Sequence, residues 1–262
     1  MHSKGEKIRK NFAGVEEVMK VLGIDTSSEV ATAALLAEEK LVAEYILNHR
    51  HTHLEKLVSM IDRLLSDSDT KLEELDAIAV AVGPGSFTGI RIGMACAQGL
   101  SHVHGIPLVG VNTLDALAHN LMHCGDFLCA AVDAQRGEVY ACLYRWEGPE
   151  LMRFWDYEVI KVGELAKRLT DLNENAVLLG DGAVLVESAL PEEVKSSGKI
   201  VVAKRPFTMP RASSVAEAGL KDLKEGRTFN CFNIRPFYMR KSHAEEKWEE
   251  RYGKGKPGKS DH

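Results

Sequence analysis

The chain lacks the features that mark several specialised classes of protein. No run of 18 apolar residues occurs among its 262 residues, so no membrane span is expected. The five cysteines are widely spaced and form no C-x-x-C pair, which disfavours a disulfide framework or a zinc site and is typical of reduced thiols in the cytoplasm. Residues 1–18 carry basic side chains but no apolar central region, so we expect a loose leader instead of a secretory signal, with the working domain starting at Met19.

Common catalytic and nucleotide-binding motifs are missing as well. The sequence has no G-x-G-x-x-G fingerprint, no Walker P-loop and no H-E-x-x-H helix. Ser86 stands in GPGSFTG, where the spacing to the next glycine does not match a G-x-S-x-G nucleophile elbow, so a peptidase is disfavoured. The net charge of −5 and the pI of about 6.1 indicate that any affinity for RNA requires a basic partner.

The chain is organised around residues 76–103. Residues 76–82 (DAIAVAV) are an apolar run that predicts a strand covered on both faces. The glycine loop GPGSFTG follows at residues 83–89, and residues 90–103 then show helical spacing with small residues that would let another helix approach closely. Two interpretations stay open: a tight turn under a packed helix, or a nucleotide-contacting loop followed by a docking helix.

A polar turn follows the first predicted strand. Asp25, Thr26 and Ser27 come directly after an apolar segment, an arrangement that sugar kinases, actin and Hsp70 use to hold Mg²⁺ and phosphate. Alternatively, these side chains only satisfy the turn through hydrogen bonds to its own backbone. The candidate nucleotide or phosphate contacts of the two segments are Asp25, Thr26, Ser27, Gly83, Gly85 and Ser86.

The two halves of the chain repeat one order of elements. In the first half we expect strands at 22–28, 30–36 and 40–48, a helix at 54–65, the strand and helix of residues 76–103, a strand at 106–111 and a further helix. The second half restarts with strands at 127–133, 138–146 and 151–160 and ends with a helix at 214–225. An α/β fold of two βββαβα-type subdomains is therefore expected, with residues 19–124 in one, 125–241 in the other and a charged helical or disordered tail at 242–262.

Three histidines alternate just before the helix expected at 54–65. They are His49, His51 and His53, and no carboxylate lies among them. Because they could converge on a metal only if the segment were extended and faced inward, we interpret them as exposed side chains at a helix entry. No metal site is expected.

Five motifs resemble the TsaB (YeaZ) family of the bacterial tRNA threonylcarbamoyladenosine system. They are MKVLGIDTS at 19–27, GPGSFTGIRIG at 83–93, DAQRGEVY at 133–140, GDGA at 180–183 and PFYMR at 236–240. The second and third are quite specific, and Gln135 departs from the family's usual DARRGEVY by a polar change in a turn. The resemblance implies the actin-like ATPase (ASKHA, ribonuclease H-like) fold, in agreement with the duplicated βββαβα order.

The same resemblance implies a non-catalytic scaffold. TsaB proteins look like degenerate relatives of TsaD, which transfers a threonylcarbamoyl group to N6 of the adenine next to the anticodon of tRNAs reading ANN codons. TsaD holds a metal through two histidines of an HMEGH segment, and the matching positions here are Thr113 and Leu117, whose side chains cannot replace imidazoles as ligands. We therefore expect no catalytic residue and no intrinsic cofactor, with ATP or ADP, if bound, at the partner interface.

By similarity, the helices at 54–65 and 90–103 would form an interface. It would serve a homodimer when the chain is alone, or pairing with a TsaD-like catalytic subunit in a complex that also contains a TsaE-like ATPase and contacts tRNA indirectly. Arg91 is expected at its rim or on a phosphate. The expected interface residues are Leu57, Ile61, Leu64, Ile90, Arg91, Gly93, Met94 and Ala97.

An alternative function is an active ATP-dependent phosphotransferase or ATPase of the same fold. Asp25 would then bind Mg²⁺, with Asp133 or Asp181 as base or second Mg²⁺ contact. Such enzymes normally carry a glycine-rich adenosine loop late in the second half, and residues 180–183 (GDGA) are only a thin version of it.

Overall fold

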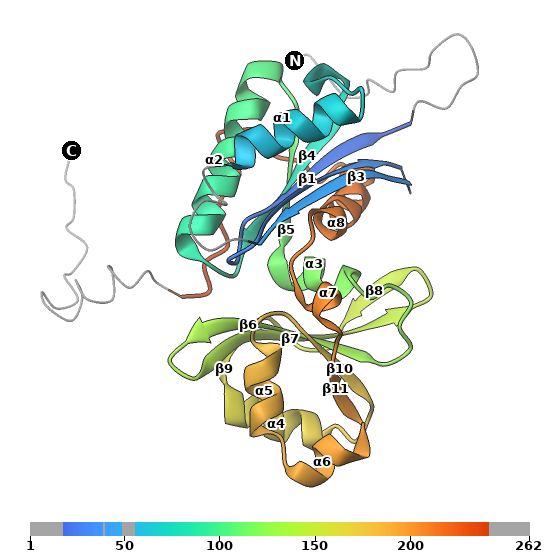
Figure 1. The fold of residues 1–262 in the computed structure, drawn as a ribbon, viewed down its shortest axis with the longest axis vertical. Helices are drawn as coiled ribbons and strands as arrows, with labels where there is room; N and C mark the ends of the chain where they lie inside the picture. The colour runs from blue at the N-terminus through green and yellow to red at the C-terminus, as the bar shows by residue number, and fades with distance from the viewer. Residues whose placement is uncertain (1–17, 39, 49–55, 241–262) are drawn as a thin grey trace, which may run out of the picture.

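The computed structural model describes residues 18–38, 40–48 and 56–240, which form two lobes, each built on one sheet (Figure 1). The sheet of the first lobe has the strand order β3-β2-β1-β4-β5. The first three strands are antiparallel neighbours, whereas β4 and β5 continue the sheet parallel to β1. The strands are β1 (Lys20–Asp25), β2 (Ala31–Ala37), β3 (Lys40–Leu47), β4 (Ala77–Gly83) and β5 (Leu108–Asn112).

Helices cover both faces of this sheet. Leu22 and Ile24 of β1 belong to the core under α1 (Leu57–Asp67) and α2 (Phe87–His104), whereas Val21 belongs to the core under α8 (Ala212–Lys224). Because both faces are buried, the central strands are apolar throughout instead of alternating. The short helix η1 (Leu72–Glu74) leads into β4.

The sheet of the second lobe has the order β11-β10-β6-β7-β8, with β9 also paired to β7. One face of β6 packs against α4 and α5, and its other face packs against α3 (Thr113–His119), which lies between the two lobes (Figure 1). The strands are β6 (Phe127–Gln135), β7 (Glu138–Glu147), β8 (Glu150–Arg153), β9 (Glu158–Lys161), β10 (Ala176–Leu179) and β11 (Ile200–Val202). The helices are α4 (Val162–Asp171), α5 (Ala183–Ala189), α6 (Glu192–Ser197) and α7 (Arg205–Thr208).

The duplicated βββαβα order predicted from the sequence is confirmed, although one expected strand is divided and the short helices α6 and α7 are additional. The strand expected at 151–160 is two strands, because four residues between β8 and β9 leave the ladder. The backbone N–H groups of Phe154 and Trp155 both point to the carbonyl of Leu143, so the edge of the sheet bulges there. Within the described parts of the chain, no helix combines the length and apolar character that crossing a membrane requires.

The end of the chain returns to the first lobe, so the boundary expected at 125–241 is wrong at its C-terminal side. Val215, Ala216 and Leu220 of α8 join the core of the first sheet, and Ile234 joins the core on the other face. The helix fits closely because Gly23 of β1 has no side chain: a Cβ there would lie 2.1 Å from the carbonyl oxygen of Ala212. The segment from Ala212 to Ile234 therefore belongs to the first lobe.

Candidate functional site

The glycine loop and the polar turn after β1 pack directly on each other. The N–H of Ser86 donates to the carbonyl of Ser27 at 2.7 Å, and the hydroxyl of Thr26 donates to the carbonyl of Gly89 at 2.7 Å. A Cβ on Gly85 would lie 2.3 Å from the Ser27 carbonyl oxygen, so only glycine permits this approach. The two segments that could have enclosed a phosphate contact each other instead.

Asp25 lies fully buried below this contact. Its Oδ1 accepts hydrogen bonds from the backbone N–H and the hydroxyl of Ser27, both at 2.7 Å, while its Oδ2 has no hydrogen-bond partner among the described residues. Burial raises the pKa of the Asp25 carboxyl to about 6, and the two bonds from Ser27 oppose that shift only in part. Asp25 and Ser27 thus bond to each other within the turn, whereas Thr26 bonds across to the start of α2.

The other candidate contacts of this loop are mixed in exposure. Ser86 is exposed, but its Oγ accepts the N–H of Gly89 at 3.2 Å and so caps α2. Gly83 is buried, and a Cβ there would lie 2.6 Å from the carbonyl oxygen of Phe237. The structure thus brings all six candidate residues together, although five of them are covered or half-covered by neighbouring parts of the chain.

The other two acids of the phosphotransferase alternative, Asp133 and Asp181, lie on the second lobe. Oδ1 of Asp181 accepts the N–H of Asp133 at 2.9 Å, and burial, with a smaller contribution from the charge of Asp133, raises the pKa of Asp181. The carboxylate of Asp133 accepts both the backbone N–H and the side-chain amide of Gln135, at 2.7 and 3.0 Å. Both acids are engaged in the turns that end β6 and β10.

The two positions matched to metal-binding histidines lie on the buried side of α3. Thr113 and Leu117 are each 1% exposed, and the hydroxyl oxygen of Thr113 has no partner among the described residues. Among the residues whose placement is described, no three His, Cys, Asp or Glu side chains gather as a metal site would require. His49, His51 and His53 lie outside the described residues.

The residues expected to form the interface are, with the exception of Arg91, in the core of the chain itself. The apolar stripe of α1 and the inner face of α2 cover the first sheet, so these side chains are unavailable to a partner, and the expectation is wrong for them. Gly93 is small for an internal reason, because a Cβ there would lie 2.3 Å from Oγ1 of Thr26. The buried residues are Leu57, Ile61, Leu64, Ile90, Gly93, Met94 and Ala97.

The face of α2 that is free carries a different set of residues. Arg91, Ala95, Gly99 and Val103 are exposed at intervals of four, and Val103 is 73% exposed. Among the described residues the space around Gly99 is open, since a Cβ there would meet none of their atoms within 4 Å. On α1, Val58 is an exposed apolar residue, at 62%. Helical spacing places the exposed residues of α2 on one side of the helix. Apart from Arg91, the residues of α2 that the sequence predicted for the interface lie on the opposite side.

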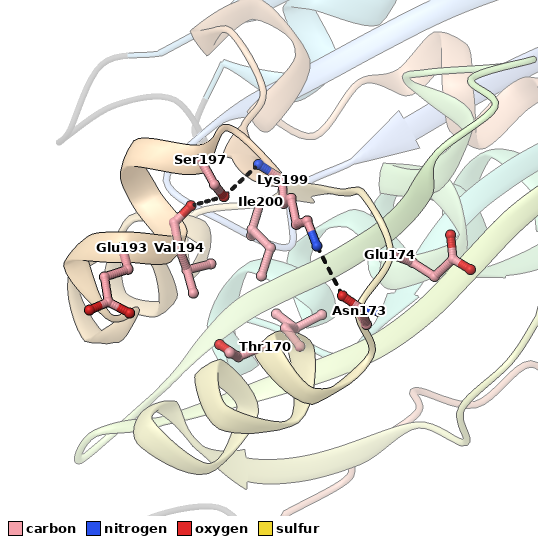
Figure 2. Close-up of a pocket in the computed structure, with 9 residues that line it drawn as sticks. Thr170, Asn173, Glu174, Glu193, Val194, Ser197, Lys199 and Ile200 are labelled. Atoms are coloured by element: carbon pink, nitrogen blue, oxygen red, sulfur yellow. Dashed lines mark hydrogen bonds between the residues drawn. The ribbon is translucent and has the colours of Figure 1, made fainter.

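A pocket at the far end of the second lobe is separate from all of these residues. It has a volume of about 290 Å³ and lies between α4, α6 and the start of β11 (Figure 2). Inside it Nζ of Lys199 donates to Oδ1 of Asn173 at 2.9 Å, and the acids Glu174 and Glu193 also line it. No residue of the predicted site lines this pocket.

Comparison with known proteins finds matches over most of the chain. The family model described as "TsaD: tRNA N6-adenosine threonylcarbamoyltransferase" matches residues 40–248. The TsaB protein of Bacillus subtilis, named for tRNA threonylcarbamoyladenosine biosynthesis, is 32% identical over 232 residues, which cover 88% of this chain and 99% of that protein. The TsaB protein of Escherichia coli is 31% identical over 244 residues, covering 90% and 100%.

A solved structure supports the same relationship. It is described as an uncharacterized protein from Pseudomonas aeruginosa with similarity to peptidase YEAZ, and it superimposes with a TM-score of 0.73 at 26% identity. The match covers 85% of this chain and all of that one.

Proposed function

Because this chain belongs to the TsaB (YeaZ) family of tRNA threonylcarbamoyladenosine biosynthesis proteins, we propose that it serves as the non-catalytic scaffold subunit of that system. Its partners are a TsaD-type catalytic subunit and a TsaE-type ATPase, and alone it forms a homodimer. tRNA is contacted through the complex, in the cytoplasm, where tRNA is modified.

The observation that supports this proposal most is the exposed face of α2. Ala95 and Gly99 leave the helix backbone open to close approach, and Val103 adds apolar surface on the same helix. Small residues at helical spacing let two helices pack near the lower end of the usual 8–10 Å interaxial range. A helix that only covered its own sheet would need no small residues on the outside.

The proposal that the chain has no catalytic role of its own is supported by different residues. Thr113 and Leu117 replace the histidines of the matched segment, and both are buried in the core around α3. Ser27 bonds to one oxygen of the buried Asp25 carboxylate and the glycine loop packs on this turn, so the described part of the chain presents no open phosphate loop there. We therefore propose that ATP or ADP, when bound, lies at the interface with the partner.

Reconstitution of the modification tests the proposal. The TsaD-type and TsaE-type subunits of the same organism are mixed with threonylcarbamoyl-adenylate and an unmodified tRNA, and the modified nucleoside is measured by mass spectrometry. The wild-type chain should restore modification, whereas Gly99→Leu should not, because the new side chain blocks close approach. Gly163→Leu, at an equally open glycine on α4, is the matched control and should restore it. Equal modification without the chain would refute the scaffold role.

A further inference from the structure

The guanidinium of Arg91 is held in place at the first turns of α2. Its Cζ lies 3.9 Å from the centre of the Phe87 ring, one helical turn earlier, and its Nε donates to the hydroxyl of Tyr238 at 2.9 Å. The rings of Phe87 and Tyr238 are themselves stacked, 5.0 Å between centres. An arginine side chain normally loses much rotamer freedom when it binds, and these contacts have removed that freedom beforehand.

Most hydrogen-bonding capacity of this guanidinium is unused by the described residues. Arginine has five N–H donors in a planar fork, and only the Nε–H of Arg91 has a partner among the residues the structure describes. Arg91 is exposed and makes no ion pair with a carboxylate in the described parts of the chain. By contrast, Arg63, Arg211 and Arg240 each pair with an acid.

The segment that carries Tyr238 is fixed at both ends. The N–H of Phe237 donates to the carbonyl of Val82 at 2.8 Å, at the end of β4 in the first lobe. Two residues beyond Tyr238, Arg240 pairs with Glu138 of β7 in the second lobe at 3.0 Å. The first turn of α2 lies at the end of that helix nearest the second lobe (Figure 1). Tyr238 therefore holds Arg91 from a segment that is anchored on both lobes.

On these grounds, and resting on the proposed function, we propose that Arg91 receives a carboxylate of the TsaD-type partner through a two-pronged hydrogen bond, with Phe87 and Tyr238 as positioning residues. Carboxylates match the planar fork of arginine in geometry and charge. Arg91 stands one helical turn before Ala95, so a helix packed on the open face of α2 passes within reach of it. The bond fixes the register of the partner on this helix.

Two other occupants fit the observations less well. A second copy paired symmetrically through α2 would bring the same helix to both sides, and residues 87–104 contain no aspartate or glutamate to meet Arg91. RNA phosphate would meet a chain with a net charge of −5, which opposes binding of a polyanion. A carboxylate on a different protein meets neither objection.

Calorimetric titration of the TsaD-type subunit of the same organism into the chain tests the proposal. Arg91→Lys keeps the charge but removes the fork, and should weaken binding by about tenfold or more, the range of a charge-assisted hydrogen bond. Tyr238→Phe removes one hydroxyl and should weaken binding by about threefold, with the stacked ring kept. Arg63→Lys, an exposed arginine on α1, is the matched control and should bind as the wild type does. Thermal unfolding of each variant verifies that the fold is retained.

The outcomes are separable. Binding of Arg91→Lys equal to wild type would overturn the inference while leaving the scaffold role intact, whereas failure of the wild-type chain to bind would refute both. If Arg91→Lys no longer binds an anticodon stem-loop RNA but still binds the partner, the ligand of Arg91 is a phosphate instead. If Arg91→Lys loses only homodimerisation, the ligand lies on a second copy of the chain. If binding falls as expected, substitution of exposed acids on the partner should reveal one that couples to Arg91 in a double-mutant cycle. Coupling to none of them would also overturn the inference.

Discussion

The buried carboxylate of Asp25 makes stability depend on pH in an unusual direction. Burial raises its pKa from an ordinary 3.8 to about 6, so the folded state holds the proton more tightly than the unfolded state does. Stability then falls as pH rises through this interval, because the folded chain must bury a charge. Well above pH 6 the folded chain carries the full cost of burying the charged carboxylate. The interval from 3.8 to about 6, at 1.36 kcal/mol per pH unit, gives a cost of about 3 kcal/mol.

Asp25→Asn removes this titration. Asparagine can still accept the bonds from Ser27, and any constant cost of the new amide cancels when two pH values are compared. The cost carried by the wild type is about 1 kcal/mol near pH 4.5 and about 3 kcal/mol near pH 7.5. The variant should therefore gain about 2 kcal/mol relative to wild type between these conditions, measured as the free energy of unfolding in urea.

A second aspartate serves as control of opposite sign. Asp67 accepts bonds from Tyr45 and Arg63, which lower its pKa, so its contribution to stability is lost as pH falls. Asp67→Asn should accordingly lose stability relative to wild type as pH rises. A difference between wild type and Asp25→Asn that stays constant across the range, or that reverses, would refute the burial of an uncompensated carboxylate under the glycine loop.

Two further predictions concern the packing of the core. Gly23→Ala should lower the free energy of unfolding in urea by about 1–3 kcal/mol or more, because the new Cβ would collide with the carbonyl of Ala212. The control Gly125→Ala, at an open position, should change it by less than about 0.5 kcal/mol. Equal effects of the two substitutions would contradict the close packing of α8 on the first sheet. In the native protein at pH 8, a thiol reagent should label the half-buried Cys124 and Cys231 but not Cys129, whose thiol is fully buried and has its pKa raised by that burial. Labelling of Cys129 at the rate of Cys231, followed by mass spectrometry, would show that the core of the second lobe is open.

The order of elements was predictable because its signals are local. Strands covered on both faces are apolar runs such as residues 76–82, and the duplicated order follows from reading those runs along the chain. The return of α8 to the first lobe was not predictable, because it depends on a fit between Gly23 and Ala212, which are far apart in sequence. Hydrophobic periodicity predicts that a helix has an apolar face, but it does not predict which sheet that face covers.

The sequence did not identify the exposed face of α2 correctly, for a related reason. Both sides of this helix carry small residues, Gly93 and Ala97 on one and Ala95 and Gly99 on the other. Gly93 is small because it lies against Thr26, whereas Gly99 on the other side meets no described residue within 4 Å of an added Cβ. Composition alone cannot separate these two causes, so the choice required the position of β1 below the helix.

The central claim is that the exposed side of α2 holds another subunit. Size-exclusion chromatography with light scattering, on the chain mixed with the TsaD-type subunit, measures this directly. Wild type and Gly163→Leu should elute as a complex with the summed mass, and Gly99→Leu should elute as separate components although it unfolds at the wild-type temperature. A complex of full mass formed by Gly99→Leu would contradict the claim.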